Sequence, residues 1–150
     1  MRANEREIMA RGDYWFVFPF RVRYAEIDGQ GVVFNANYLM YFDTAITEYI
    51  RALGYDYADQ PASTGTDFHT VKALVEYREP IRFDDEIEVA VRAGRVGSSS
   101  LTFALEIHPK GEDRVLSSGE IVWVNAYVGQ HKSAPLPEDL VAKIREREPA

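Results

Sequence analysis

The segment from residue 37 to residue 53 constrains the fold more than any other, because large apolar residues recur in it every three or four positions. This spacing is typical of an α-helix with one broad apolar face. The face comprises Tyr38, Leu39, Tyr41, Phe42, Ala45, Ile46, Tyr49, Ile50 and Leu53. Asn35 and Asn37 are both suitable N-caps, since a short amide side chain can accept a hydrogen bond from a free N–H group of the first turn. Gly54 is suited to end the helix because glycine adopts the left-handed conformation without steric cost.

Strands are predicted on both sides of this helix from the alternation of apolar and polar residues. One precedes it at residues 14–24, where Pro19 indicates an edge strand or a bulge because proline cannot donate to a neighbouring strand. Four strands follow the helix, at 69–78, 86–95, 101–107 and 115–128. In the last of them, Ser117-Ser118-Gly119 suggests a bulge or a bend. The four strands are joined by short connections, so we expect them to form an antiparallel meander.

The helix is the only predicted element apolar enough to cover the dry face of such a sheet. The expected fold class is therefore α+β, a curved antiparallel sheet wrapped around one long central helix. With 150 residues and no repeat, low-complexity tract or linker, the chain is long enough for a single domain, 1–150. Residues 1–13 are expected to form a loose arm or short surface helix, 55–67 a turn or broken helix followed by a loop, and 136–147 a C-terminal amphipathic helix.

Composition narrows the classes of function. The formal net charge of −7 argues against a nucleic-acid partner, which would need a basic face to displace counterions from phosphates. The sequence has no cysteine, so it has no disulfide, thiolate nucleophile or cysteine-bound metal. The charged N-terminus is not followed by an apolar run of signal-peptide length, and no stretch has about 18 consecutive apolar residues. We therefore expect a cytoplasmic protein with no membrane partner.

Common catalytic and metal motifs are absent from the sequence. It has no Gly-x-Ser-x-Gly elbow, phosphate-binding loop, dinucleotide fingerprint or His-Glu-x-x-His zinc motif. His69, His108 and His131 lack metal-like spacing and are interpreted as surface or strand histidines. The acidic run Asp84-Asp85-Glu86 is interpreted as a solvated turn. We therefore expect no metal site.

Asp28 is the leading candidate for a catalytic carboxylate. It lies seven residues before Asn35, in a glycine-rich loop that leads to the start of the predicted helix. Free N–H groups and the helix dipole at that end favour a developing oxyanion, so an acid held nearby is suited to acyl chemistry. Asp-Gly is also a common turn dipeptide, so a purely structural role for Asp28 stays open. Asp43, beside the apolar face, is expected to be partly buried, either as a structural hydrogen bonder or as the wall of a pocket.

Several short motifs carry a family resemblance. They are Asp28-Gly29-Gln30-Gly31-Val32-Val33-Phe34-Asn35-Ala36-Asn37-Tyr38, then Tyr41-Phe42-Asp43 with Glu48, then Val75-Glu76-Tyr77 with Pro80 and Asp84-Asp85, and then Ser99-Ser100-Leu101-Thr102-Phe103. The first resembles the Asp-x-x-Gly-Val-Val-(aromatic)-x-x-x-Tyr signature of hotdog-fold acyl-CoA thioesterases of the 4-hydroxybenzoyl-CoA thioesterase group. The others match the same group in order, so the similarity covers about residues 16–140. The family fold is the sheet around a helix that the periodicity also predicts.

The resemblance implies an enzyme that hydrolyses an acyl-CoA thioester, with an aromatic or a short- to medium-chain acyl group, to the free acid and CoA. Asp28 matches the catalytic carboxylate, which acts either as a nucleophile or as a general base for water. Asn35 matches the position whose backbone N–H polarises the thioester carbonyl. Tyr38 and Asp43 match positions that can contact the substrate. Many bacterial relatives carry histidine at the position of Asn35, so a mechanism that uses that imidazole is not available here.

The resemblance also implies a binding region for coenzyme A and an assembly. Ser99 and Ser100 match the turn near the pantetheine and phosphates, and His131 and Lys132 lie where family members place nucleotide-binding cations. Coenzyme A is part of the substrate, so no separate cofactor is implied. Known members form dimers whose helices share an interface, usually doubled to tetramers, which implies a homodimer or homotetramer with shared active sites. Two alternatives stay open: a hotdog hydratase or dehydratase of acyl thioesters, and a non-catalytic acyl-CoA binding module.

Overall fold

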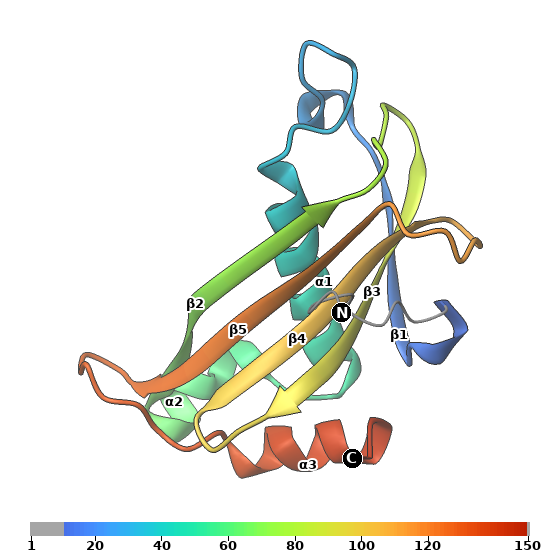
Figure 1. Cartoon of the computed structure of the whole chain (residues 1–150). Coiled ribbons are helices and arrows are strands. Elements are labelled where there is room, and N and C mark those ends of the chain that lie inside the picture. The colour runs from blue at the N-terminus through green and yellow to red at the C-terminus, as the bar shows by residue number, and fades with distance from the viewer. Residues whose placement is uncertain (1–10, 150) are drawn as a thin grey trace, which may run out of the picture.

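The structure is a computed structural model that describes residues 11–149 (Figure 1). Its strands and α-helices are, in chain order, β1 (Phe16–Arg21), α1 (Asn37–Ala52), α2 (Gln60–Thr64), β2 (Thr66–Tyr77), β3 (Glu86–Val96), β4 (Ser100–Pro109), β5 (Ser117–Tyr127) and α3 (Glu138–Arg147). Short 3-10 helices lie at Arg11–Asp13, Tyr24–Glu26 and Tyr57–Asp59. Most of the expected N-terminal arm, residues 1–10, lies outside the described residues. The broken helix predicted within 55–67 takes the form of the third 3-10 helix followed by α2.

The five strands form one antiparallel sheet in the order β1-β3-β4-β5-β2. The two edges of the sheet are β1 and β2 (Figure 1). Pro19 therefore lies in an edge strand, as predicted, opposite Glu88 of β3. An edge strand tolerates proline because the missing N–H can be the one that would have pointed away from the sheet.

The predicted meander is wrong in one respect, because β4 and β5 lie between β2 and β3. The connection at 78–85 must cross three strand spacings, a distance of roughly 14 Å. When this segment is fully extended, it can span about 26 Å. A connection that is short in sequence can therefore cross the end of the sheet. On its way it pairs with the loop that precedes α1: the Val33 N–H donates to the Ile81 carbonyl at 2.7 Å, and Val32 and Arg82 form an antiparallel bridge.

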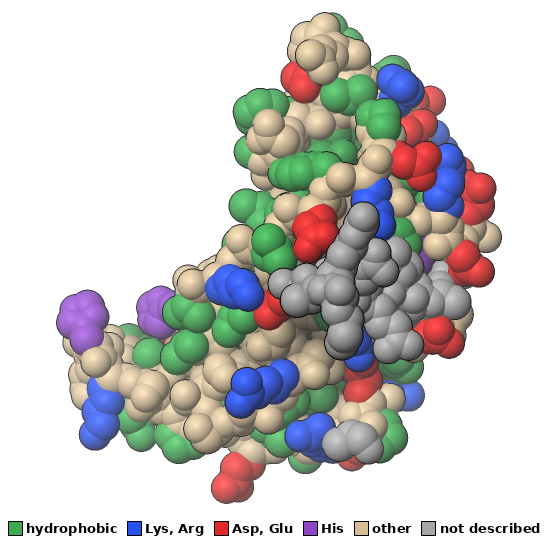
Figure 2. All heavy atoms as spheres, in the orientation of Figure 1, with side chains coloured by type: hydrophobic (Ala, Val, Ile, Leu, Met, Phe, Trp, Pro, Cys, Tyr) green, Lys and Arg blue, Asp and Glu red, His purple; other side chains and the backbone are tan. Residues whose placement is uncertain are grey.

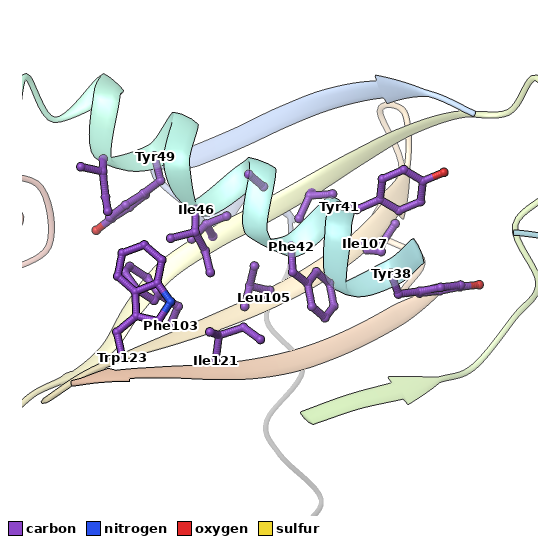
Figure 3. Close-up of a cluster of buried hydrophobic side chains, with 14 of the residues drawn as sticks. Tyr38, Tyr41, Phe42, Ile46, Tyr49, Phe103, Leu105, Ile107, Ile121 and Trp123 are labelled. Atoms are coloured by element: carbon purple, nitrogen blue, oxygen red, sulfur yellow. The ribbon is translucent and has the colours of Figure 1, made fainter. Parts of the chain in front are cut away.

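α1 lies across the inner face of the curved sheet, as predicted (Figures 1 and 3). Its buried side chains are Tyr38, Tyr41, Phe42, Ala45, Ile46, Tyr49 and Ile50. They pack against side chains of β4 and β5 that include Phe103, Leu105, Ile107, Ile121 and Trp123. The removal of this apolar surface from water is the main force that holds the helix to the sheet. The apolar face is narrower than predicted, because Leu39 is 39% exposed.

Neither of the predicted N-caps caps α1. The N-cap residue is Ala36, whose side chain has no group to donate or accept, and Asn37 is the first residue of the helix. The Asn37 side-chain amide donates instead to the Glu26 carbonyl at 2.8 Å, which ties the start of the helix to the segment before it. The prediction for the other end is confirmed: Gly54 has a φ of 84°, and its N–H donates to the Arg51 carbonyl.

Gly119 is not part of a bulge, contrary to the prediction. The register runs without a shift through positions 117–119 against both neighbours of β5, and the register shifts of the sheet lie in β2 and β3. A Cβ at position 119 would lie 2.3 Å from Cε2 of Phe42 and 2.7 Å from the Leu74 carbonyl oxygen. Glycine is required here because α1 approaches the sheet closely, and not because of a bulge.

The C-terminal end of α1 is covered by the end of α3. The Tyr49 hydroxyl donates to the Glu148 carboxylate, and the Ala93 N–H donates to the same oxygen at 2.9 Å. The Arg147 guanidinium lies over the Trp15 ring, 5.1 Å from its centroid. These contacts fix the last turn of α3 against both α1 and the sheet.

Charged side chains of both signs are interspersed on the surface (Figure 2). Several form ion pairs at the β1 edge and its neighbouring loops, among them Arg21 with Glu86 at 2.7 Å and Arg114 with Glu79 at 3.2 Å. Such exposed pairs contribute little to stability. Among the described residues, no helix is long and apolar enough to cross a membrane.

Candidate active site

Asp28 lies in a closed loop between β1 and α1. An antiparallel bridge between Ile27 and Val33 closes the loop, and the Asp28 N–H donates to the Val32 carbonyl at 2.8 Å. Oδ1 of Asp28 accepts the Gln30 N–H at 2.8 Å. Within residues 11–149 the second carboxylate oxygen, Oδ2, accepts no hydrogen bond. One oxygen therefore anchors the turn, and the other is free to react.

Glu26 fixes the base of this loop. The residue is 5% exposed. Oε1 accepts hydrogen bonds from the Arg23 N–H at 2.8 Å and the Tyr41 hydroxyl at 2.9 Å, and Oε2 pairs with the Arg23 guanidinium at 2.7 Å. The Glu26 carbonyl accepts the Phe34 N–H and the Asn37 side chain. One residue thus joins both ends of the loop to α1, and no sequence signal distinguishes it from a surface glutamate.

Replacing Glu26 by Gln is expected to lower stability in a pH-dependent way. Burial alone would raise the pKa of the Glu26 carboxyl, but hydrogen bonds from Arg23 and Tyr41 outweigh it and hold the pKa below its ordinary value of 4.5. A carboxylate whose pKa is lowered by folding stabilises the fold above its unfolded pKa, and that stabilisation is lost as pH falls through the folded value.

We therefore expect Glu26→Gln to cost about 2 kcal/mol in the free energy of unfolding near pH 7, and progressively less below the ordinary pKa. Chemical denaturation of both proteins near pH 7 and at two lower pH values measures the difference. Glu48→Gln, on the outer side of α1, is the control, since its partner is the exposed Arg51. A cost for Glu26→Gln that stays constant down to about pH 3 would contradict the ionised role.

The peptide groups just before α1 are oriented by hydrogen bonds to their carbonyl oxygens. The Phe34 carbonyl accepts the Asn37 N–H at 2.9 Å, and the Asn35 carbonyl accepts the Tyr77 hydroxyl at 3.0 Å. In the part of the chain that the structure describes, the N–H groups of Asn35 and Ala36 have no acceptor. Because they are the first amides of a helical turn, they point out of the N-terminal end, where the helix dipole adds to their positive potential.

Tyr38 packs beneath this end of the helix. Its side chain is 4% exposed, and its ring lies edge to face with that of Tyr77, 4.7 Å between centroids. Burial, and secondly the neighbouring Tyr77, raise the pKa of the Tyr38 hydroxyl, so it stays protonated. The predicted contact of Tyr38 with substrate stays a prediction.

Asp43 lies at a cavity of about 210 Å³ between α1 and the strands β2 and β5. The other lining residues are Leu39, Thr70, Ala73 and Ile121. The expectation that Asp43 is partly buried is wrong, because its side chain is exposed. It therefore stands at the rim of a mostly apolar cavity, where it keeps its hydration and can still meet a ligand.

The four residues predicted to bind coenzyme A lie in two segments, the β3–β4 turn and the loop after β5. They are Ser99, Ser100, His131 and Lys132. The Asn125 N–H donates to the Ser99 carbonyl and the Leu136 N–H to the Ser98 carbonyl, which joins the β3–β4 turn to β5 and to the segment before α3. In Figure 1 both segments lie at the end of the molecule opposite the loop that contains Asp28. Within one chain, the structure does not bring these four residues to Asp28.

The three histidines do not come together. His69 and His131 are exposed, whereas His108 is fully buried on the face of the sheet opposite α1 and pairs with Glu106 at 2.7 Å. Among residues 11–149, no group of three or more His, Cys, Asp or Glu side chains could hold a metal ion.

The sequence is similar to known proteins along most of its length. Residues 22–144 match the family described as the thioesterase-like superfamily. The chain is 30% identical over 133 residues to the acyl-CoA thioester hydrolase YbgC of Escherichia coli, which covers 87% of this chain and 96% of that protein. It is 23% identical over 124 residues to a 1,4-dihydroxy-2-naphthoyl-CoA hydrolase of Thermosynechococcus vestitus, which covers 83% of this chain and 84% of that one.

Solved structures share the fold. A Pseudomonas aeruginosa protein superposes with a TM-score of 0.81 at 24% identity, covering 92% of this chain and 94% of that one. A 1,4-dihydroxy-2-naphthoyl-CoA thioesterase from Synechocystis superposes with a TM-score of 0.80 at 19% identity, covering 86% and 94%. These likenesses confirm the predicted α+β hotdog fold, a curved antiparallel sheet around one long helix.

Proposed function

Because this chain belongs to the thioesterase-like superfamily and hydrolyses acyl-CoA thioesters, we propose that Asp28 is its catalytic carboxylate. The observation that carries the proposal is the loop between β1 and α1. One oxygen of Asp28 anchors the turn and the other is free, and the unsatisfied amides of Asn35 and Ala36 follow a few residues later. An attacking group and an oxyanion site thus lie on one short segment, which Glu26 holds against the helix.

Hydrolysis needs an attack on the thioester carbonyl and a stabilised negative charge on its oxygen. In one route Asp28 adds to the carbonyl carbon, the C–S bond breaks to give a mixed anhydride and the CoA thiolate, and water hydrolyses the anhydride. In the other route Asp28 takes a proton from water, whose oxygen adds to the carbonyl before the thiolate leaves. In both routes the N–H groups of Asn35 and Ala36 donate to the oxyanion, each worth on the order of 10²-fold in rate.

The acyl group is proposed to occupy the cavity beside Asp43. A space of about 210 Å³ suits an aromatic or a short- to medium-chain acyl group. Its apolar lining favours such a group by burial, and the Asp43 carboxylate could accept a hydrogen bond from a hydroxyl at its far end. The similar proteins named above as naphthoyl-CoA hydrolase and thioesterase act on an aromatic acyl group.

A panel of benzoyl-, hydroxybenzoyl- and straight-chain acyl-CoA esters tests this function, with CoA thiol release as the readout. We expect turnover with at least one aromatic or short- to medium-chain ester. Saturable binding of the panel without thiol release would identify a binding module instead. Hydration of crotonyl-CoA without release of CoA would identify a hydratase.

We propose further that two copies join along β2, as a homodimer or as half of a homotetramer. β2 is a long edge strand of 12 residues, and proteins rarely leave such an edge open. Apolar side chains lie exposed on β2 and α1, with Val71 61%, Leu39 39% and Met40 38% exposed. A second copy would cover both the unpaired backbone and this apolar surface. We also propose a cytoplasmic location, which the absence of cysteine fits.

Antiparallel pairing of two β2 strands would explain why the predicted site residues are divided. The end of β2 lies at the Asp28 side, since Tyr77 bonds to Asn35, and its start lies at the coenzyme A side, since Thr66 pairs with Tyr127. A two-fold axis across β2 sets the end of one strand beside the start of the other. Asp28 of each chain would then face Ser99, Ser100, His131 and Lys132 of its partner.

Mixing two defective variants tests the shared site. Asp28→Asn removes the carboxylate, and a His131→Glu, Lys132→Glu double variant repels the CoA phosphates and is expected to lower kcat/KM about tenfold or more. After the subunits are exchanged in an equal mixture, half of the dimers are mixed and each has one intact site. Activity at low substrate should then recover to about a quarter of wild type.

Native mass spectrometry of the mixture is the control for subunit exchange. If mixed dimers form and activity does not rise above that of the double variant alone, both groups act within one chain and the shared site is wrong.

A further inference from the structure

We infer that Tyr77 is a positioning residue for the hydrolysis, acting through the peptide group between Asn35 and Ala36. The Tyr77 hydroxyl donates to the Asn35 carbonyl at 3.0 Å, across 42 residues of sequence. Tyr77 is the last residue of β2, and Asn35 lies just before α1. The inference rests on the proposed function, because it assigns to Tyr77 the orientation of amides that are proposed to bind the oxyanion.

The geometry of the peptide group makes this bond relevant to catalysis. A trans peptide is planar, so its carbonyl and its N–H point in opposite directions. A donor that fixes the Asn35 carbonyl therefore also fixes the direction of the Ala36 N–H. The same bond polarises the peptide and makes its N–H a stronger donor. The other hydrogen bond to this carbonyl, from the Tyr38 N–H, is long at 3.4 Å, so Tyr77 provides the better restraint.

Packing holds the Tyr77 ring although the residue is 54% exposed. The ring stands edge to face against the buried ring of Tyr38, 4.7 Å between centroids. The end of β2 is in turn bonded to β5: the Arg78 N–H donates to the Leu116 carbonyl, and the Ser117 hydroxyl to the Glu76 carbonyl at 2.8 Å. The sheet and the Tyr77 side chain therefore form one continuous support for the Asn35–Ala36 peptide that precedes α1.

Because Tyr77 is half-exposed, its hydroxyl is not expected to contribute much to the stability of the core. A half-exposed tyrosine that lost its hydroxyl would let water reach the Asn35 carbonyl, so folding would lose little. The orientation of the peptide would be lost, because a water molecule does not hold the carbonyl in one direction. Tyr77→Phe therefore separates positioning from folding, since it removes the donor and keeps the ring that contacts Tyr38.

Steady-state kinetics of Tyr77→Phe test the inference. Loss of a direct oxyanion donor costs about 10²- to 10³-fold in kcat, and loss of a residue that orients such a donor should cost less, about 10-fold. We expect this fall in kcat with KM within about twofold of wild type, since the substrate makes no contact with the hydroxyl. Tyr55→Phe is the matched control: it removes a hydroxyl that donates to Gln60 at 2.8 Å beyond the other end of α1, and kcat should not change.

A spectroscopic readout separates orientation from general loosening. A thioester labelled with ¹³C at its carbonyl is bound to Asp28→Asn, and the shift of its carbonyl stretch to lower frequency reports the strength of the oxyanion donors. Adding Tyr77→Phe to this background should reduce the shift, whereas adding Tyr55→Phe should not.

Three results would overturn the inference: wild-type kcat in Tyr77→Phe, a carbonyl shift that does not change, or a rise in KM with unchanged kcat. If Asp28→Asn is inactive in the same assays, the proposed function stands even when the inference on Tyr77 fails. If Asp28→Asn hydrolyses substrate like wild type, the catalytic assignment itself fails, whatever Tyr77→Phe does.

Discussion

Asp28→Asn is expected to lower kcat by about 10³-fold, because it removes the only nucleophile or general base that we assign to the reaction. The substitution is nearly isosteric. The asparagine keeps an oxygen that can accept the Gln30 N–H, so the turn that holds the loop should survive. We therefore expect the free energy of unfolding of Asp28→Asn to lie within about 0.5 kcal/mol of the wild-type value. Its affinity for a nonhydrolysable acyl-CoA analogue should be unchanged. Thiol-release kinetics, denaturation and calorimetry measure the three quantities.

Asp59→Asn is the matched control for this prediction. Asp59 is an exposed aspartate in the segment between α1 and β2, remote from the loop at the start of α1, and its loss of charge should leave kcat unchanged. Asp28→Ala adds a second comparison, since it also removes the acceptor of the Gln30 N–H. Hydrolysis at the wild-type rate in both Asp28 variants would disprove the catalytic role and leave the carboxylate as part of a turn.

Gly119→Val is expected to destabilise the fold by more than about 3 kcal/mol, the upper range for overpacked cores. The added side chain would start 2.3 Å from the Phe42 ring and 2.7 Å from the Leu74 carbonyl oxygen. Phe42 is fully buried on α1 and cannot turn away without opening a cavity, and the Leu74 contact is with backbone. The helix would have to move off β5, so both the sheet and the start of α1 should be affected. Thermal and chemical unfolding measure the loss.

Gly94→Ala is the control for Gly119→Val, because a methyl group added to this strand glycine makes only ordinary van der Waals contacts. Its Cβ would lie 3.6 Å from the nearest atom, an ordinary contact. Stability within about 1 kcal/mol of wild type is expected there. Gly119→Ala should fall between the two variants. If Gly119→Val unfolds with the same free energy as Gly94→Ala, the close approach of α1 does not constrain this position.

The sequence predicted correctly those features whose cause lies within a single segment of the chain. α1 follows from the spacing of its apolar residues, which is the spacing that buries Phe42 and Ile46. Pro19 correctly marked an edge strand, because the consequence of a missing N–H is local. Gly54 correctly marked the end of α1, because its left-handed conformation is also a local property of the backbone.

Features that depend on distant partners were not predictable in this way. The order of the strands was wrong, because an extended connection can cross the sheet as easily as it can turn back, and its length alone does not distinguish the two. Gly119 suggested a bulge or a bend, because the side chain that requires glycine there, the ring of Phe42, lies 77 positions earlier in the chain. Asn35 and Asn37 suggested caps, yet the N-cap residue is Ala36, and the Asn37 side chain bonds to the Glu26 carbonyl instead.

The candidate site was predictable in part. Asp28 and the start of α1 emerged from the loop motif and its resemblance to a family, and the structure adds the free carboxylate oxygen and the free amides. Glu26 and Tyr77 were not assigned roles, because what distinguishes them is a set of bonds across the fold. The separation of Asp28 from Ser99 and Lys132 could not be read from one sequence either, since it depends on how two ends of a sheet are arranged.

The pairing of β2 with β5 also has a consequence for how the protein folds. Glu76 meets Ser117 across 41 residues of chain, whereas β3 and β4 are joined by a tight hairpin. Contacts between residues far apart in sequence form slowly, because the entropy of closing the loop is lost before the contacts repay it. β2 is therefore expected to dock after the hairpin and α1. Since β2 carries Tyr77, the proposed active site would be complete only after β2 has docked. Partly folded molecules would therefore be inactive.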